Sequence, residues 1–536
     1  LPIADEPTPK VYFGRNIQAK SIEQKTGNLK QMTQMKPRNP TFYWYDYETF
    51  GVDPKRNRPA QFAGRRTGLI FEPVSEGEVF YCRPAMDQLP SPESSLLTGI
   101  TPQLCEEKGL RETEFAQDVW DRLNAPGTVS IGYNTLGFDD EVNRFLFWRN
   151  FLDAYQHSWA NGCSRWDLFP VVCAAWALRG DAIKWPKWED IDPAVYPKAA
   201  GRSGVCFKLE FLTKANGIEH GHAHDALSDV EATIGLARLL AEKEPRLWQW
   251  AFENRTKEKV LAAISGAKPV VWVTPRFGVA RGCTGIAACF YQDKNDCWMW
   301  DLMEDPTILR TLSLEEFRKR AFPTAEDRAA GTVRLPIKQL KANASPFVCS
   351  NLRVLSQDRA KQYGIDFEVV QQNLAKLREI IPLIQTVFAE VLGMRFADEK
   401  LDVHPDPDTS LYSSGFASAN DKVQFAKIRE SNPQELKKLS ESGALHFDDP
   451  QFSEMLLRYR ARNWPETLSP EDAADWKALC RRRLMEGEDR ALTVNRYFEE
   501  IDRAQESGQF DDEMHQEILG ALYEWGERLG EFASED

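Results

Sequence analysis

The sequence has few features of a membrane, secreted or zinc-binding protein. Its ten cysteines are scattered over 536 residues without a Cys-x-x-Cys pair, which argues for reduced thiols and against a disulfide framework or a structural zinc site. No run approaches the roughly 18 apolar residues that a membrane helix needs, and no secretory h-region stands near the start. These features predict a cytoplasmic protein without a membrane partner.

Positive charge is also scarce, because 67 Lys and Arg stand against 81 Asp and Glu and leave a net charge of −14. A protein that coats nucleic acid is typically basic, so this balance disfavours sequence-blind wrapping of duplex DNA. It is compatible with an enzyme that threads one strand through a groove, because electrostatic fields are local and basic residues can gather there.

The length predicts about two to four domains, because a single hydrophobic core does not grow to this size. Residues 1–40 carry seven Lys or Arg against three Asp or Glu and predict a disordered basic tail. Alternating strand and helix patterns over 41–245 predict an α/β domain. Short β-like runs over 246–365, with a hairpin signal at 292–296, are typical of a small antiparallel barrel. Residues 366–536 show helical periodicity and predict an all-α domain.

Periodicity also places individual elements. In the first part we expect strands at 42–49, 79–82 and 128–133, and helices at 112–124, 140–151, 166–177 and 226–242. In the second part we expect strands at 270–273, 286–291, 297–302 and 333–337. In the last part we expect helices at 367–392, 453–463, 470–486, 492–506 and 511–531.

Two carboxylates stand two positions apart in the first expected strand, at Asp46 and Glu48. Residues two apart point to one face of a strand, and Phe42 and Trp44 share that face. Carboxylates are costly to bury on an aromatic face unless a cation neutralises them. Mg²⁺ binds such carboxylates together with water and phosphate oxygens. Taken alone, the pair is explained equally well by a strand end whose acids face water.

Asp139 follows the expected strand at 128–133 and begins a helix. Aspartate before a helix is a common cap, and Asp140 or Glu141 could cap equally well. Considered by itself, Asp139 is therefore better explained as a cap than as a metal ligand.

Three of the seven histidines fall at 220, 222 and 224. A zinc cluster is one interpretation, but no cysteine or further histidine supports it. His224 and Asp229 are five positions apart and do not share one helix face. We expect Asp229 to project from the first turns of a helix capped by Asp225, and His224 to lie on the lead-in as a mobile base.

Together these residues describe four carboxylates around two divalent metal ions, with a base beside them. Two ions about 4 Å apart clamp the attacking and leaving oxygens of an in-line displacement at phosphorus. Near pH 7 a neutral imidazole is the side chain best suited to take the proton of the attacking water. The set therefore predicts cleavage of phosphodiester bonds with two Mg²⁺ ions, for which Mn²⁺ can substitute.

The ordered set Asp-x-Glu, Asn-x₃-Phe-Asp and His-x₄-Asp resembles the histidine-bearing branch of the DEDD 3′→5′ exonuclease superfamily. Other segments are similar to bacterial exodeoxyribonuclease I and span nearly the whole chain after residue 41. They are Asp46-Tyr-Glu-Thr-Phe-Gly51, Arg58-Pro-Ala-Gln-Phe-Ala63, Leu97-Thr-Gly-Ile-Thr-Pro102, Gly132-Tyr-Asn134 with Phe138-Asp-Asp-Glu-Val142, Ser164-Arg-Trp-Asp-Leu168, Leu212-Thr-Lys-Ala-Asn-Gly-Ile-Glu-His220 and Tyr459-Arg-Ala-Arg-Asn463.

This resemblance implies a ribonuclease H-like α/β exonuclease domain, an SH3-like β-barrel and an all-α C-terminal domain. In that family the three close around single-stranded DNA and release 5′-mononucleotides from its 3′ end, in DNA repair and recombination. The resemblance assigns metal binding to Asp46, Glu48, Asp139 and Asp229, and activation of water to His224. Asp140 is not at the motif position.

The same resemblance implies the residues that contact the DNA strand. They are Glu48, Phe138, Arg144, Tyr155, Trp159 and Lys208. Arg144 would meet a backbone phosphate, and Tyr155 and Trp159 would stack on or wedge between bases, unless they pack in a core. Lys208 stands where the family usually has arginine, so a phosphate contact is expected without the two-pronged geometry of a guanidinium.

Arg179 matches a basic position of the pocket in which family members bind the acidic C-terminal tail of single-stranded DNA-binding protein. A helix-end arginine with a solvated head is the alternative. We expect a monomer. Two competing hypotheses are an exoribonuclease that uses the same site and a non-enzymatic, single-strand-binding repair scaffold. The two additional domains favour DNA, and the complete acidic set favours an enzyme.

Overall fold

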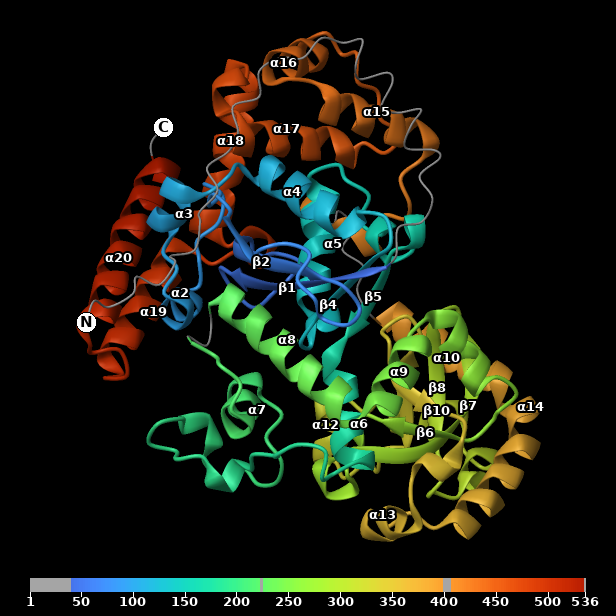
Figure 1. The fold of residues 1–536 in the computed structure, drawn as a ribbon. Helices are drawn as coiled ribbons and strands as arrows, with labels where there is room; N and C mark the ends of the chain where they lie inside the picture. Colours follow the sequence, from blue (N-terminus) through green and yellow to red (C-terminus); the bar gives the residue numbers. More distant parts are fainter. Residues whose placement is uncertain (1–39, 222–224, 399–405, 535–536) are drawn as a thin grey trace, which may run out of the picture.

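The computed structural model describes residues 40–221, 225–398 and 406–534, and its fold is shown in Figure 1. The expected N-terminal tail, apart from residue 40, and the expected base His224 lie outside these residues. Within the described ranges, no helix combines the length and the apolar composition that crossing a bilayer would require.

A five-stranded sheet lies at the centre of the first part. Its strands are β1 (Thr41–Thr49), β2 (Pro59–Thr67), β3 (Glu78–Tyr81), β4 (Thr128–Gly132) and β5 (Ser164–Asp167), in the order β3-β2-β1-β4-β5. β1, β4 and β5 are parallel, whereas β2 and β3 are antiparallel to their neighbours. The central strand β1 is thus hydrogen-bonded on both edges and is held rigidly.

Helices cover both faces of this sheet (Figure 1). The first part contains the helices α2 (Pro92–Thr98), α3 (Pro102–Lys108), α4 (Glu112–Asn124), α5 (Asp139–Arg149), α6 (Leu168–Leu178), α7 (Leu209–Asn216), α8 (Ala226–Lys243) and α9 (Pro245–Glu253). Of these, α4 and α5 pack on one face of the sheet, and α6 and α8 pack on the other. Alternation along β1 divides its aromatic side chains, because Tyr43 and Tyr45 pack with α4 and α5, whereas Phe42 and Trp44 pack with α6 and α8. Burying a large apolar side chain such as Phe42 contributes about 1.5–3 kcal/mol, and both faces of β1 bury aromatic side chains, so both faces fix the position of the strand.

A second five-stranded sheet follows. It consists of β6 (Val270–Val273), β7 (Thr284–Asp293), β8 (Asp296–Asp301), β9 (Ile337–Lys341) and β10 (Phe347–Cys349), all antiparallel, in the order β10-β6-β7-β8-β9. The long helix α14 (Phe367–Asp398) packs against it, and the Phe388 ring lies 4.9 Å from that of Phe290 and 5.3 Å from that of Trp298.

The remaining described chain is helical. After the 3-10 helix η12 (Pro407–Tyr412), it forms α15 (Ala419–Glu430), α16 (Pro433–Glu441), α17 (Gln451–Asn463), α18 (Pro470–Arg481), α19 (Val494–Glu506) and α20 (Glu513–Ser534). Figure 1 shows these helices gathered beside the first sheet, on the side away from the second sheet.

The structure confirms most expected elements and corrects several. Strand β2 was not predicted, because its leading proline and its Gly-Arg-Arg segment hide the β pattern, and α15 and α16 were not predicted either. The helix expected from residue 166 begins at Leu168, because Ser164–Asp167 pairs with β4. The strand expected at 333–337 lies at Ile337–Lys341, since pairing with β8 selects it, and the strand β10 that follows it was not predicted.

The hairpin loop is also shorter than the five residues expected. Asp293 pairs directly with Asp296, which leaves only Lys294 and Asn295 in the turn. Lys294 takes the left-handed φ of 51° that two-residue hairpin turns require. The domain limits at 245/246 and 365/366 stay predictions.

Candidate active site

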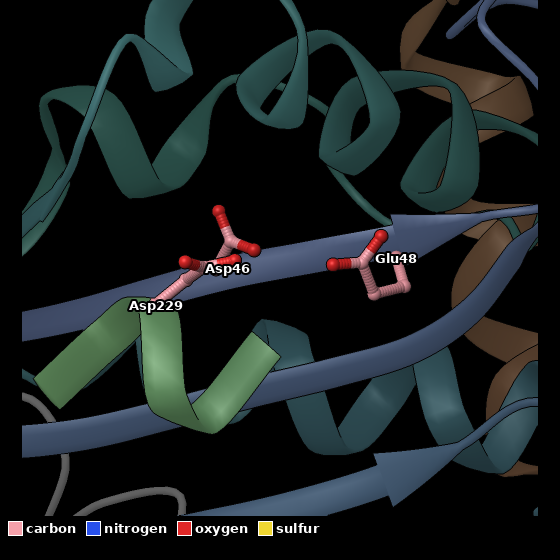
Figure 2. A group of neighbouring side chains, drawn as sticks. All are labelled: Asp46, Glu48 and Asp229. Carbon is pink, nitrogen blue, oxygen red and sulfur yellow. The ribbon is translucent and has the colours of Figure 1, made fainter. Parts of the chain in front are cut away.

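Three predicted metal ligands meet where β1 passes the start of α8. Asp46 and Glu48 lie on the face of β1 that Phe42 and Trp44 share, and Asp229 lies in the first turn of α8. Carboxylate oxygens of Asp46, Glu48 and Asp229 all lie within 4.8 Å of one another. Figure 2 shows the Asp46 and Asp229 carboxylates side by side, with Glu48 further along the strand.

Asp139 reaches the same place from α5. It is the first residue of that helix and is buried, and its Oδ1 accepts a hydrogen bond of 3.2 Å from the Tyr47 backbone N–H. Tyr47 stands between Asp46 and Glu48, so this bond attaches Asp139 to the strand that carries both. The structure therefore brings together all four carboxylates predicted to bind metal.

Burial and mutual repulsion make it unfavourable for these four groups to ionise together. Burial, followed by the charges of Asp139, Glu48 and Asp229, raises the pKa of Asp46 well above its ordinary value. Burial, Asp229 and Asp139 raise the pKa of Glu48 to about 9, and burial raises that of Asp139 to about 7. Close carboxylates of this kind need a neutralising cation. A set made only of oxygen donors suits a hard divalent ion such as Mg²⁺.

His220 is a functional neighbour that sequence reasoning missed. Its Nε2 lies 2.6 Å from Oδ1 of Asp229, and its Nδ1 lies 3.1 Å from Oγ1 of Thr213. The three histidines at 220, 222 and 224 were the available signal, but the His-x₄-Asp motif selected His224 rather than His220. His220 therefore holds the carboxylate of Asp229 from the side of α7.

Two further polar residues fix the chain around the site and were not predicted. The buried Asp167 carboxylate accepts hydrogen bonds from the backbone N–H groups of Asn134, Leu136 and Phe169, and burial raises its pKa to about 6. It thereby sets the path of the loop that leads into α5. The available sequence signal was its place in the family-like segment Ser164-Arg-Trp-Asp-Leu168.

Gln61 plays the corresponding role for α8. Its Oε1 accepts a 3.2 Å hydrogen bond from the N–H of Ala226, and its Nε2 donates to Tyr81 at 3.1 Å. Gln61 pairs with Glu48 in the β1–β2 register. The strand beside Glu48 therefore also anchors the helix that carries Asp229.

Asp140 has a different environment from its neighbour Asp139. Its fully buried carboxylate accepts hydrogen bonds from Arg165 and from His157 (3.0 Å), and its Oδ2 lies 3.1 Å from Nε of Arg144. Burial alone would raise the pKa of Asp140, but Arg165, Arg144 and His157 hold it below its usual range. Asp140 is engaged in ion pairs, which agrees with assigning the metal to Asp139.

A cavity of about 530 Å³ opens beside Asp46 and Asp229. Lys208 lies in its wall, with Nζ 3.3 Å from Oε1 of Glu210 and 5.2 Å from the ring centroid of Tyr196. The predicted phosphate-binding cation thus lines the same space as two metal-binding carboxylates.

The other predicted DNA contacts differ in their exposure. Arg144 is 9% exposed, and its Nη1 donates to Glu141 at 3.1 Å and to the hydroxyl of Tyr412 at 2.9 Å. Its guanidinium also lies 5.4 Å from the ring centroid of the half-buried Tyr155. Phe138 is half-buried against the core beneath α5.

Trp159 is 70% exposed and follows a single 3-10 turn that begins after Tyr155. The alternative that Trp159 packs in the core is therefore wrong, and its ring is accessible to a base.

Arg179 ends α6, as the helix-end interpretation expected. Its Nε lies 3.4 Å from Oε2 of Glu244, and its Nη1 donates to the Leu178 carbonyl at 2.7 Å. The head remains partly exposed. Binding of a partner's acidic tail by Arg179 stays a prediction.

Comparison with known proteins gives consistent matches along the chain. Residues 43–237 match the domain family described as Exonuclease, residues 255–393 the Exonuclease I SH3-like domain, and residues 405–529 the Exonuclease I C-terminal domain. The chain is 39% identical to exodeoxyribonuclease I of Haemophilus influenzae over 83% of its own length and 90% of that protein.

Comparison with solved structures also gives matches that cover most of the chain. The structure of a moderately thermophilic exonuclease I from Methylocaldum szegediense superimposes with a TM-score of 0.82 at 36% identity, covering 91% of this chain and 99% of that one. The zinc-bound form of Escherichia coli exonuclease I in complex with single-stranded DNA gives 0.79 at 35% identity, covering 92% and 100%.

Proposed function

The chain belongs to the exodeoxyribonuclease I family, and from this membership we propose that Asp46, Glu48, Asp139 and Asp229 form its hydrolytic site for single-stranded DNA. The family's ribonuclease H-like exonuclease domain, SH3-like domain and helical C-terminal domain are all present. The enzyme degrades the strand in the 3′→5′ direction to 5′-mononucleotides. The observation that carries the site assignment is the convergence of four carboxylates from β1, α5 and α8, two of which, Asp46 and Asp229, line one cavity.

The proposed cofactor is a pair of Mg²⁺ ions, which Mn²⁺ can replace. Bound cations of this kind acidify a water molecule and neutralise charge on the phosphoryl group. The four carboxylates supply only oxygen donors, and the raised pKa values of Asp46, Glu48 and Asp139 reflect an unfavourable burial of negative charge that a cation would relieve. The zinc-bound relative supports the use of a divalent ion within this fold.

Each remaining residue has a proposed task that follows from its chemistry. His224 takes the proton of the attacking water. The Tyr47 backbone N–H holds the Asp139 carboxylate directly. The Asp167 carboxylate holds the loop that leads to Asp139, by accepting hydrogen bonds from its backbone N–H groups. Lys208 offers a positive charge to a phosphate in the cavity that also reaches Asp46. Trp159 offers an exposed ring on which any base can stack.

Further parts of the proposal concern partners and surroundings. Arg179 would bind the acidic C-terminal tail of single-stranded DNA-binding protein by exchanging its present partner Glu244 for the tail. The enzyme would act as a monomer in a reducing cytoplasm, in which its ten unpaired cysteines stay reduced.

The test uses oligonucleotides labelled at one end. Single-stranded DNA labelled at the 3′ end should release labelled mononucleotide at once in Mg²⁺, whereas a 5′ label should appear in mononucleotides only late. RNA of the same sequence, present in the same tube with a different dye, should be degraded far more slowly. Absence of mononucleotide from the DNA, or equal rates for both polymers, would contradict the proposal.

Magnesium should stabilise the protein more strongly at alkaline pH. The folded, metal-free protein holds protons on Glu48 and Asp139 up to pKa values of about 9 and about 7, far above the ordinary values of about 4. The folded state therefore binds these protons more tightly than the unfolded state, and their contribution to stability is lost as pH rises through that window. A cation replaces the protons and restores the loss.

The expected increase in melting temperature on adding Mg²⁺ to EDTA-treated protein is near zero at about pH 5.5 and about 2–4 °C at about pH 8.5. Differential scanning calorimetry measures both values. An equal shift at the two pH values would show that the carboxylates do not titrate as described.

Removing the ring of Trp159 should weaken substrate binding without affecting the fold. Stacking on an aromatic side chain contributes about 1–3 kcal/mol per base, so Trp159→Ala should raise KM for single-stranded DNA by about tenfold and change kcat little. Trp159→Phe should retain most of the affinity. Because the side chain is exposed, both variants should melt at the wild-type temperature. Unchanged KM for Trp159→Ala would remove this residue from the strand's path.

A further inference from the structure

Arg165 connects the second sheet to the edge of the active site. It lies in β5, and its nearly buried side chain divides between two acceptors, with Nη1 on the carboxylate of Asp140 and Nη2 donating to the carbonyl of Asn343 at 3.1 Å. Its own carbonyl accepts a 3.3 Å hydrogen bond from Oγ of Ser345. Asn343 and Ser345 belong to the turn between β9 and β10, so Arg165 is bound to the SH3-like domain through both its side chain and its backbone.

Arg165 is linked to the metal site through the backbone between Asp140 and Asp139. Asp140 follows Asp139 directly at the start of α5. Successive residues of an α-helix are rotated by about 100°, so a contact that fixes Asp140 also fixes the direction in which Asp139 projects. Asp139 has its own anchor on β1, the N–H of Tyr47. Two anchors on different sides therefore determine the rotation of the first turn of α5.

We propose that Arg165 is a positioning residue, which ties the β9–β10 turn of the SH3-like domain to Asp140 and thereby orients the metal ligand Asp139. The inference rests on the proposed function only for the role of Asp139 as a ligand. Partners behind a ligand commonly change metal affinity or activity by about 10–100-fold when they are removed. Arginine suits this task because its planar fork serves two acceptors at fixed angles, which a lysine ammonium does not.

A stability role alone is the competing explanation, since Arg165 is a nearly buried charge in a sheet. Arg66 provides the matched control. It lies in β2 of the same sheet and is half-buried, and it donates to Oγ1 of Thr41 and Thr128 at 2.8 and 2.9 Å and to the Arg122 carbonyl at 2.7 Å. None of these partners touches Asp139 or Asp140. Arg66→Met thus removes a comparable network without reaching the metal site.

The experiment measures Mn²⁺ binding to the full-length protein by titration calorimetry, together with kcat and KM on single-stranded DNA. Arg165→Met should weaken Mn²⁺ binding and lower kcat, each by about 10–100-fold, with KM changed less than about twofold. Arg66→Met should lower the melting temperature and leave Mn²⁺ affinity unchanged. Ser345→Ala, which removes one bond to Arg165, should weaken Mn²⁺ binding by about twofold to tenfold.

Wild-type Mn²⁺ affinity in Arg165→Met, or equal weakening in Arg66→Met, would overturn the proposal. If Arg165→Met does not fold, Arg165→Lys decides, because lysine can reach Asp140 but cannot also hold Asn343, and wild-type Mn²⁺ affinity in that variant would overturn the proposal too. The binding measurement is independent of catalysis. A protein that loses Mn²⁺ affinity on Arg165→Met but never released mononucleotides would contradict the proposed function and leave the positioning role standing.

Discussion

Replacing Asp46 by asparagine should reduce the rate of single-stranded DNA hydrolysis by about four orders of magnitude, or about 5.5 kcal/mol of transition-state stabilisation. Asparagine keeps the shape of the side chain and removes its charge. Asp46 stands close to the three other carboxylates. Its pKa is raised by burial and, because of this closeness, by the charges of Asp139, Glu48 and Asp229. A neutral amide at this position cannot take its share in holding a divalent cation.

The same substitution should not destabilise the metal-free protein. Asp46 is buried beside three other carboxylates, so its ionised form is unfavourable in the folded state without a cation. In EDTA at about pH 8, Asp46→Asn should therefore melt at or above the wild-type temperature. Loss of activity together with retained stability would separate a chemical role for Asp46 from a structural one.

Asp225→Asn is the matched control for this experiment. Asp225 caps α8 by accepting a 2.9 Å hydrogen bond from the N–H of Ser228, and its charge also raises the pKa of Asp46. Asparagine caps a helix as well as aspartate does, so this variant removes a nearby charge and keeps the helix start. Its kcat should stay within about twofold of wild type. Activity above a tenth of wild type in Asp46→Asn, or an equal loss in Asp225→Asn, would exclude the proposed site.

Local periodicity was sufficient to predict the parts of the site that lie on one element. The two-residue repeat of a strand placed Asp46 and Glu48 on one face with Phe42 and Trp44, and the structure shows this arrangement. Helical periodicity placed Asp229 in the first turn of α8. Both inferences needed only the geometry of a single element.

Contacts between elements could not be predicted in this way. The bond from Tyr47 to Asp139 joins residues 92 positions apart, and it forms because β1 and β4 pair in parallel and deliver the α5 start to β1. The support of Asp229 by His220 depends on the path that residues 217–220 take after α7. Periodicity carries no information on such pairings, so the resemblance to a known family supplied what the pattern lacked.

Buried charge was the largest feature that the sequence concealed, since charged residues are usually exposed. Acidic and basic side chains from the exonuclease domain and the C-terminal domain are buried against one another. They are Arg58, Asp87, Glu112, Arg149, Asp406, Asp408, Arg458, Arg483 and the side chain of Arg462. The carboxylate of Asp408 lies near the middle, with Oδ2 2.6 Å from Arg462, 3.1 Å from Arg458 and 3.4 Å from Arg58. This cluster therefore joins the two domains through buried ion pairs.

Asp408→Asn should lower the free energy of unfolding by about 3–5 kcal/mol, because removing one partner of a buried ion pair leaves the other charges uncompensated. Arg462 and Arg458 hold the pKa of Asp408 well below its ordinary value despite burial. The carboxylate therefore stabilises the fold above about pH 4, and this stabilisation is lost as pH falls further.

Urea denaturation near neutral pH and again at about pH 3 measures both effects, and the difference between Asp408→Asn and wild type should shrink at the lower pH. Glu454→Gln is the control, because Glu454 pairs with the same Arg458 at 2.5 Å but its side chain is 50% exposed. Exposed pairs contribute about 0–1 kcal/mol, so this variant should unfold close to wild type. If both variants lost the same stability, general loss of charge around Arg458, rather than burial between the domains, would explain the effect.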